Sequence, residues 1–345
     1  MGELFDKVLK SDESLFLNSQ FLDYDYQPKL VPFRETQQQH IALCIKPLLQ
    51  RRNGKNIVVF GKPGVGKTVS LKQVLNELKD DYGNDVYCFY VNCWKRDSSF
   101  KIISEICQQL NYKWTHNKNF DELMGAAAEI VNEKSAVIVL DEADKLQDQN
   151  IIYNILEEFH RRCIILITNE NSFVAKLDNR IKSRLLADLL EFKPYNYYET
   201  EEILKQRVEY SFVPGTLEKN SFEHIVKKTF DMRDIRAGLF LLKQSGEIAE
   251  NKSSKKITID HVDIAINSLV DIDFEDNSDL SSIIDIIKLN PGKSKSEIFK
   301  IYEENGGKSY RTFQRKIKEL ESKGKIKVKE DINNFGRQEI LEYLD

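Results

Sequence analysis

Short uninterrupted apolar runs recur in the first half of the chain, at residues 57–60, 136–140 and 163–167. Runs of this length are typical of strands that are buried on both faces of a parallel sheet. The segment after the first run carries apolar residues at helical spacing, from Val69 to Leu78. Strands that alternate with helices in this way predict an α/β fold with a parallel sheet.

The pattern changes beyond residue 195, where helical periodicity continues with few strand signals. We therefore predict an N-terminal segment and α/β core over residues 1–194, and a helical domain over residues 195–270. The acidic, polar stretch 271–279 is typical of a linker. A separate C-terminal domain is expected over residues 280–345.

Residues 280–345 show the pattern of a winged helix, in which helices are followed by a strand hairpin. A capping-box pattern, Ser294 with Glu297, opens the second helix of this domain. Ser309 can cap the third helix, whose apolar residues share one face and whose basic residues share another. The expected hairpin consists of strands at 325–329 and 338–344 and a wing tip at 333–337.

Composition and cysteine usage favour a soluble, intracellular, multidomain protein. The chain has 345 residues, of which 41% are hydrophobic and 31% charged. No apolar run approaches the roughly 20 residues that span a membrane, and the first residues show no secretory pattern. The five cysteines are scattered without the spacing of a zinc motif, so we expect reduced core thiols.

The net charge of −4 hides an uneven distribution. Residues 308–329 carry nine basic and two acidic side chains, whereas the rest of the chain is acidic, which predicts a local surface for a polyanion. We expect the third helix of the winged helix to enter the major groove of DNA. A solvated basic helix or a protein-binding winged helix would give the same pattern. The candidate DNA contacts are Lys308, Arg311, Gln314, Arg315, Lys318 and Arg337.

A glycine-rich loop follows the first apolar run and matches the phosphate loop G-x-x-x-x-G-K-[ST] at every fixed position. Its glycines permit a tight turn that directs backbone N–H groups toward phosphate oxygens. Lys67 can reach the β- and γ-phosphates, and Thr68 can offer its hydroxyl to Mg²⁺. The residues expected to hold ATP or ADP here are Pro63, Gly64, Val65, Gly66, Lys67, Thr68 and Val69.

Acidic and amide side chains follow the next two apolar runs, where parallel sheets bind their ligands. Asp141 is placed to hold Mg²⁺ through water, and Glu142 to orient or deprotonate the attacking water. Asn169 can contact the γ-phosphate or that water, because its amide both donates and accepts. Taken alone, the acidic pair could cap the next helix, but the phosphate loop upstream favours a metal site.

These motifs, in this order, resemble those of an AAA+ ATPase: a Walker A loop, a Walker B pair and a sensor 1 amide. The resemblance implies an AAA+ P-loop NTPase core with a parallel sheet, a helical lid and a C-terminal winged-helix domain. Residues 141–144 also resemble the motif of DEAD-box helicases, but the sequence contains no second helicase core. Residues 23–37 and 90–93 resemble the archaeal origin-recognition and replication-initiator family.

This family resemblance implies contacts that spacing alone does not assign. The N-terminal segment surrounds the adenine in the family, which implies that Val31, Pro32 and Arg34 lie near the base. An additional helix of the family lies in the neighbourhood of residues 99–110. The basic residues implied to approach DNA there are Lys95, Arg96 and Lys101.

Three arginines are candidates for the family's charge-stabilising residues. Arg184 is the preferred arginine finger, which acts on the nucleotide of a neighbouring subunit, and Arg180 is the second candidate. Arg236 resembles the sensor 2 arginine, which contacts the γ-phosphate from the lid. The sensor 2 box departs from the family pattern at Arg233, in place of glycine, and at Gly238, in place of alanine.

The resemblance as a whole implies an ATP-regulated replication initiator that is cytoplasmic and nucleoid-associated. Such a protein would bind origin duplex DNA through the winged helix and the AAA+ core, and would use slow, Mg²⁺-dependent ATP hydrolysis as a switch. Other initiator subunits or a replicative helicase are the implied partners. Two alternatives remain: a DNA motor or clamp-loader-like subunit, and a DNA-binding regulator that uses nucleotide only as a structural ligand.

Overall fold

The chain divides into two compact units, Met1–Val262 and Asp263–Asp345. The first unit holds the predicted core and most of the predicted helical domain, and the second holds the rest of that domain and the whole of the predicted winged helix. The computed structural model describes residues 14–343, apart from Asp25, Lys29, His116, Asn171 and the segments 305–309, 323–324 and 334–335.

Five parallel strands form the central sheet of the first unit, in the order β2-β3-β4-β1-β5. Every residue of β3 is buried, as expected for a strand that is covered on both faces. The predicted α/β class with a parallel sheet is therefore confirmed. The strands are β1 (Ile57–Phe60), β2 (Val86–Asn92), β3 (Ser135–Asp141), β4 (Arg162–Thr168) and β5 (Asp188–Glu191).

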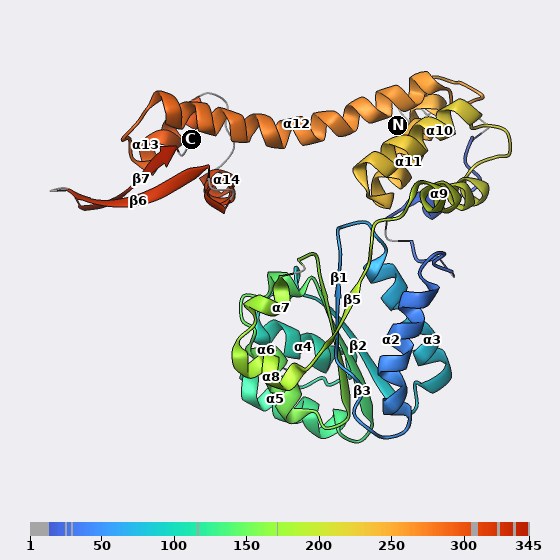
Figure 1. The fold of residues 1–345 in the computed structure, drawn as a ribbon, viewed down its shortest axis with the longest axis vertical. Coiled ribbons are helices and arrows are strands. Elements are labelled where there is room, and N and C mark those ends of the chain that lie inside the picture. Colours follow the sequence, from blue (N-terminus) through green and yellow to red (C-terminus); the bar gives the residue numbers. More distant parts are fainter. Residues whose placement is uncertain are drawn as a thin grey trace, which may run out of the picture. The chain divides into compact units, whose positions relative to one another are not determined.

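Helices cover both faces of this sheet (Figure 1). On one face lie α2 (Glu35–Leu49) and α3 (Lys67–Tyr82), which pack against Val137 and Val139 of β3. Ile138 and Leu140 of the same strand enter the opposite core, because neighbouring side chains of a strand point to opposite faces. That second core is covered by α4 (Ser99–Gln109), α5 (Phe120–Val131), α6 (Asn150–Glu158), α7 (Phe173–Lys176) and α8 (Asn179–Leu185).

The helical domain consists of α9 (Tyr197–Ser211), α10 (Lys219–Met232), α11 (Ile235–Asn251) and the start of α12. The 3-10 helix η1 (Ser19–Leu22) packs against α9 and α11. Phe16 stacks on Phe212 at the end of α9, with ring centroids 4.8 Å apart. The described start of the N-terminal segment, which the sequence analysis grouped with the core, therefore lies against the helical domain.

Helix α12 runs without interruption from Ile259 to Leu289. The stretch 271–279, predicted as a linker from its acidic and polar character, is therefore helical. Residues 259–289 contain neither glycine nor proline, so no residue in this range breaks the backbone hydrogen bonds of a helix.

The rest of the second unit has the helices and hairpin of a winged helix: α13 (Lys295–Glu304), α14 (Tyr310–Ser322), β6 (Ile326–Asn333) and β7 (Gly336–Tyr343). The predicted capping box is confirmed, because Ser294 N donates to Glu297 Oε2 at 2.8 Å. The antiparallel ladder continues to the pair Asn333–Gly336. The strands thus extend into the predicted wing tip, since continued cross-strand pairing satisfies backbone groups that a longer loop would leave to water.

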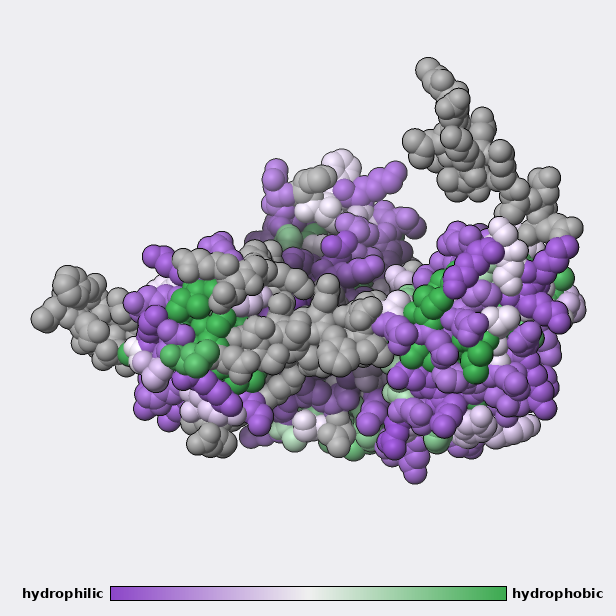
Figure 2. All heavy atoms as spheres, turned by 90° about the horizontal axis from the view of Figure 1, so that it is seen from above, coloured by the Kyte–Doolittle hydropathy of each residue, from purple (hydrophilic) through white to green (hydrophobic). Residues whose placement is uncertain are grey.

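Hydrophilic residues dominate the face of the molecule seen in Figure 2, and hydrophobic residues form small separate patches on it. Within the described residues, no helix has both the length and the apolar character needed to cross a membrane. The five cysteines, predicted as reduced thiols, carry no disulfide, and all except Cys88 are buried.

Candidate functional site

The phosphate loop joins β1 to α3 and thus lies at the carboxyl end of a central strand. Gly64 and Gly66 have backbone φ angles of 72° and 90°, a left-handed conformation that glycine adopts readily. Lys67 is the first residue of α3. The N–H groups and the dipole of that helix N-terminus favour an anion, which agrees with the phosphate-binding role predicted for the loop.

The Lys67 ammonium is surrounded by three acceptors. Its Nζ donates to Gly61 O at 2.7 Å, to Lys62 O at 2.9 Å and to Asn169 Oδ1 at 2.8 Å. Burial lowers the pKa of Lys67, and nearby carboxylates oppose that shift. Lys67 and Asn169, the predicted sensor 1 amide, are thus in direct contact, so a phosphate oxygen near one of them also lies near the other.

Asp141 is 3% exposed at the end of β3, and both of its carboxylate oxygens accept hydrogen bonds. Oδ2 accepts from Thr68 Oγ1 at 2.8 Å and from the Tyr90 hydroxyl at 2.5 Å, and Oδ1 accepts from Glu142 N at 2.9 Å. The Thr68 hydroxyl and the Asp141 carboxylate are hard oxygen donors of the kind that Mg²⁺ prefers. Sequence analysis missed Tyr90, because its place beside Asp141 depends on the β2–β3 pairing, which no motif encodes.

Glu142 has a left-handed backbone, with φ of 57°, and its Oε2 accepts from Asn169 Nδ2 at 3.1 Å. Burial, together with repulsion from Asp141 and Asp144, raises the pKa of Glu142. A carboxylate whose pKa is raised takes up a proton more readily, which suits a general base. The structure therefore brings Glu142 and Asn169, the predicted Walker B glutamate and sensor 1 amide, into contact at one edge of the sheet.

The start of α11 reaches the phosphate loop. Ile235 N donates to Gly64 O at 3.4 Å, and a methyl group on Gly64 would lie 1.8 Å from Asp234 Oδ1. The guanidinium of Arg236 pairs with Asp234, with Nη2–Oδ2 at 2.8 Å and Nε–Oδ1 at 3.1 Å. This hydrogen bonding raises the pKa of Arg236. The predicted sensor 2 arginine therefore lies beside the phosphate loop, where it is held by Asp234, the N-cap residue of α11.

Arg34 is 4% exposed and joins three distant stretches of backbone. Its guanidinium donates to Phe33 O at 3.1 Å, to Val65 O at 3.0 Å and to Lys193 O at 2.7 Å. The guanidinium carbon also lies 3.8 Å from the centroid of the Tyr195 ring, within cation–π range. Arg34 thus connects the N-terminal segment, the phosphate loop and the segment that leads to the lid.

The other predicted nucleotide contacts surround the loop. Val65 is 1% exposed, so its backbone rather than its side chain is available to a phosphate. Pro63 is exposed and Val69 is half-buried. Val31 is buried and Pro32 half-buried, and their contact with adenine stays a prediction, as does that of Arg34.

Both candidate finger arginines lie on α8 with partly exposed side chains. Arg184 forms an ion pair with Glu157 of α6, and its guanidinium carbon lies 4.8 Å from the centroid of the Tyr153 ring. Arg180 pairs with Asp178 at 3.3 Å. These contacts belong to α6 and α8, which is compatible with a residue that serves another subunit's nucleotide.

Helix α14 has an apolar face and a polar face, as its sequence predicts. Phe313, Ile317 and Leu320 are buried in the core of the second unit. Lys316 is also buried, 1% exposed, so this basic residue does not belong to the outer surface. The candidate DNA contacts that are exposed on α14 are Gln314, Arg315 and Lys318.

The remaining DNA candidates fall wholly or partly outside the described structure. Lys308 lies in the segment 305–309, which is not described. Arg311 lies in α14 and Arg337 in β7, but their side chains are not described. Arg337 pairs with Ile332 in the hairpin ladder.

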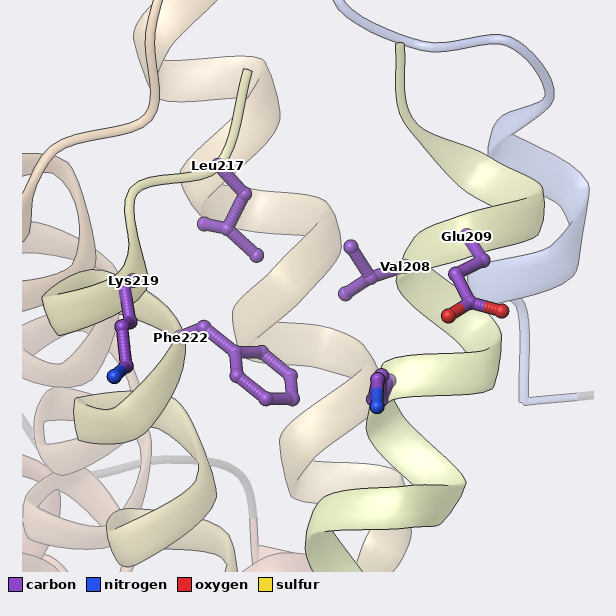
Figure 3. Close-up of a pocket in the computed structure, with 6 residues that line it drawn as sticks. Val208, Glu209, Leu217, Lys219 and Phe222 are labelled. Atoms are coloured by element: carbon purple, nitrogen blue, oxygen red, sulfur yellow. The ribbon is translucent and has the colours of Figure 1, made fainter. Parts of the chain in front are cut away.

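A separate pocket of about 230 Å³ lies in the helical domain between α9 and α10 (Figure 3). Val208, Leu217 and Phe222 point into it, with charged side chains at its rim. None of its lining residues belongs to the phosphate loop, β3 or β4. This pocket is therefore distinct from the nucleotide site.

Comparisons with known proteins agree with this architecture. Residues 50–177 match a family model described as an AAA domain, and residues 201–267 match the Cdc6 AAA+ ATPase-type lid domain. The ORC1-type DNA replication protein of Pyrococcus horikoshii is 31% identical over 285 residues, which cover 76% of this chain and 67% of the relative. The ORC1-type DNA replication protein 2 of Methanothermobacter thermautotrophicus is 27% identical over 335 residues, with coverage of 91% and 88%.

Among solved structures, the Aeropyrum pernix ORC1 protein in complex with DNA has a TM-score of 0.74 and 25% identity to this chain, and covers 96% of this chain and 94% of its own. Fold, phosphate loop and lid define the class: an AAA+ ATPase with a Cdc6-type lid. Within that class, the chain belongs to the ORC1-type DNA replication proteins, the archaeal initiator family that its motifs resemble.

Proposed function

We propose that this chain binds duplex DNA at a replication origin and that ATP regulates this binding. The observation that carries the proposal is the exposed polar face of α14, opposite the face that packs in the core of the second unit. A helix with this arrangement can dock in the major groove while its apolar side stays buried. The A. pernix relative, whose structure was determined with DNA, supports the same use of the fold.

The exposed residues of α14 and β6 are expected to make two kinds of DNA contact, to bases and to phosphates. Arg315 can read a guanine edge, while Lys318 neutralises phosphate. Two of the predicted contacts from the AAA+ core are exposed but already engaged in ion pairs, Arg96 with Glu105 at 3.0 Å and Lys101 with Asp97 at 2.8 Å. A further phosphate contact is expected from Lys327 on the exposed side of β6, where the neighbouring Lys329 is paired with Glu342 at 2.7 Å.

The nucleotide site supports slow ATP hydrolysis. Thr68 and Asp141 would hold Mg²⁺, which when bound neutralises charge on the phosphates. Glu142 accepts a proton from the attacking water, and Asn169 orients that water beside it. Asp234 pairs with Nε and Nη2 of Arg236, so the γ-phosphate would compete with Asp234 for this guanidinium, and we expect the site to act as a switch rather than as a motor.

Assembly with other initiator subunits or with a replicative helicase completes the proposal. The Arg184 side chain is 46% exposed, so a neighbouring subunit can reach it. An arginine finger stabilises transition-state charge on the nucleotide of another subunit. The nucleotide site would then be complete only in the assembled state.

The salt dependence of DNA binding tests the docking surface. Arg315→Ala combined with Lys318→Ala should weaken binding and make the log–log slope of affinity against salt less steep by roughly 1, because Lys318 is the phosphate contact and the loss of one such contact changes the slope by about 0.9. Lys205→Ala with Lys219→Ala removes equal charge from exposed lid positions and is the matched control. An unchanged slope in the α14 double variant, with ADP affinity intact, would refute docking through α14.

Chromatin immunoprecipitation of the tagged protein and of Lys67→Ala tests the origin assignment. We expect a few sharp peaks at replication start sites, with altered occupancy in the variant because Lys67 lies at the phosphate loop. Diffuse occupancy would instead support the motor interpretation. Peaks only at promoters or mobile elements would support a regulator.

A further inference from the structure

His40, Cys44 and Asp188 form a cluster that the nucleotide chemistry does not use. His40 and Cys44 lie one turn apart on α2, and Asp188 is the first residue of β5. One potential ligand atom from each side chain lies within 4.8 Å of the other two. Asp188 pairs with Ile57, the first residue of β1, so the cluster lies at the end of the sheet opposite the phosphate loop.

We propose that these three side chains form a Zn²⁺ site. The imidazole of His40, the thiolate of Cys44 and the carboxylate of Asp188 are all ordinary zinc ligands. Zinc–ligand lengths of about 2.0–2.3 Å place tetrahedral ligand atoms roughly 3.3–3.8 Å apart. The His40 Nε2–Asp188 Oδ2 distance is already 3.8 Å. Because all three ligand atoms lie within 4.8 Å of one another, only small side-chain rotations are needed to bring them to this spacing.

The orientation of His40 provides an independent reason for a ligand at this place. Its Nε2 atom is buried, and no hydrogen-bond partner for it is found in the described part of the chain. Asp188 Oδ2, at 3.8 Å, is too distant to accept a hydrogen bond from it. A buried ring nitrogen normally has a partner, and a metal ion between the three side chains supplies one.

Exposure of the cluster is suited to a metal that enters from solvent. Cys44 is 2% exposed, whereas the His40 and Asp188 side chains are 42% and 47% exposed. Three protein ligands leave a fourth tetrahedral position, which water can occupy on the open side. The bound metal would fasten α2 to β5, an edge strand that pairs only with β1 among the described strands.

Ligand chemistry distinguishes this site from the nucleotide site. Sulfur and imidazole nitrogen favour Zn²⁺ over Mg²⁺ or Ca²⁺, which prefer oxygen ligands. Thr68 and Asp141 offer only oxygen, so they select the other class of metal. The sequence signal is weak, because a His-x-x-x-Cys pair on a helix lacks its third ligand until β5 is placed beside it.

Cobalt substitution tests the proposal directly. Full-length protein is stripped with a chelator, saturated with Mg²⁺–ADP to occupy the nucleotide site, and titrated with Co²⁺. We expect a thiolate-to-Co²⁺ charge-transfer band that saturates at one equivalent and disappears when Zn²⁺ is added. Absence of this band in the wild type, or its persistence in Cys44→Ser, would overturn the site.

Matched variants separate ligation from folding. Cys88→Ser, which changes a half-buried thiol on β2, should keep the band. His40→Gln and Asp188→Asn change partly exposed side chains and should weaken Zn²⁺ binding by more than about tenfold. Zn²⁺ should raise the thermal unfolding midpoint of the wild type more than that of these two variants at the same Zn²⁺ concentration. Equal Zn²⁺ stabilisation of all three proteins would contradict the proposal, whether or not Cys44→Ser folds.

Discussion

Glu142 combines two features that distinguish it from an ordinary surface carboxylate. Its backbone is left-handed, a conformation that is uncommon for residues other than glycine, and its carboxylate accepts a hydrogen bond from the side-chain amide of Asn169. Strained backbone of this kind is often found at functional sites. At the scale of the residue, protonation of this one group is expected to control hydrolysis.

The raised pKa of Glu142 predicts a pH dependence. Glu142 accepts a proton only when ionised, so the hydrolysis rate should fall as pH decreases through a pKa above the usual value of about 4.3. Single-turnover hydrolysis measured against pH checks this, with circular dichroism to confirm that the fold persists. Glu142→Gln should bind ATP without hydrolysing it at any pH. An acidic limb at or below the ordinary glutamate pKa would contradict the assignment.

Tyr90→Phe tests whether the Tyr90 hydroxyl positions Asp141. The change removes one donor from a buried carboxylate, so we expect the free energy of unfolding to fall by about 1.5–3 kcal/mol. The Mg²⁺ concentration that half-saturates hydrolysis should rise by about tenfold or more, because Asp141 loses part of its orientation.

Tyr87→Phe, on the same strand, is the matched control for Tyr90→Phe, because the Tyr87 ring stacks on Phe89 with centroids 5.9 Å apart. Denaturant unfolding and hydrolysis assays over a range of Mg²⁺ concentrations measure both effects. A purely structural role for Tyr90 would lower stability in its variant and leave the Mg²⁺ requirement at the wild-type value.

At the scale of elements, the contact between the phosphate loop and α11 predicts a strong effect of Gly64→Ala. The added methyl would lie 2.9 Å from Asp234 Cα, which side-chain rotation cannot relieve, and the left-handed φ adds strain of about 1–3 kcal/mol. We expect lower stability and weaker ADP binding.

Gly215→Ala separates the effect of backbone strain from that of the steric clash with Asp234, because it introduces only the strain. Gly215 has φ of 84° but no described atom within 4 Å of an added methyl. Denaturant unfolding should show a loss of stability in both variants, whereas ADP titration should show weaker binding in Gly64→Ala alone. Equal ADP affinity in the two variants would contradict a functional contact between the loop and α11.

The sequence predicted those elements whose signals are local. The apolar runs correspond to β1, β3 and β4, and the capping box at Ser294 marks the start of α13. Motif spacing also identified Lys67, Asp141, Glu142 and Asn169, which the fold brings together.

Features that depend on pairing between distant segments were not predictable in the same way. Tyr90 reaches Asp141 only through the β2–β3 register, and Asp188 joins His40 only because β5 lies at the sheet edge. The helical course of 271–279 was also missed, because its acidic, polar composition suggested a linker while the absence of glycine and proline permitted a helix.

At the scale of the whole molecule, Arg184→Ala tests whether hydrolysis requires a second subunit. The wild-type hydrolysis rate per molecule should rise with protein concentration, and the variant should lose at least about tenfold of that rate, because an arginine finger acts between subunits. ADP affinity should be retained, since the described contacts of Arg184 are with α6.

Arg180→Ala is the neighbouring control on α8. Steady-state hydrolysis is measured over a range of protein concentrations for both variants. Loss in Arg180→Ala alone would assign the finger to that residue. If both variants kept the concentration dependence, neither arginine would be a finger.

Completion of the nucleotide site during synthesis depends on the hydrogen bonds of Arg34. The Arg34 guanidinium needs the carbonyl of Lys193, which lies 159 residues later in the sequence. At a synthesis rate of about 5–20 residues per second, on the order of ten to thirty seconds separate the two residues on the ribosome. During that interval the phosphate loop exists without the partner that fixes its supporting arginine. The nascent core therefore acquires a finished nucleotide site only as the segment leading to the lid emerges.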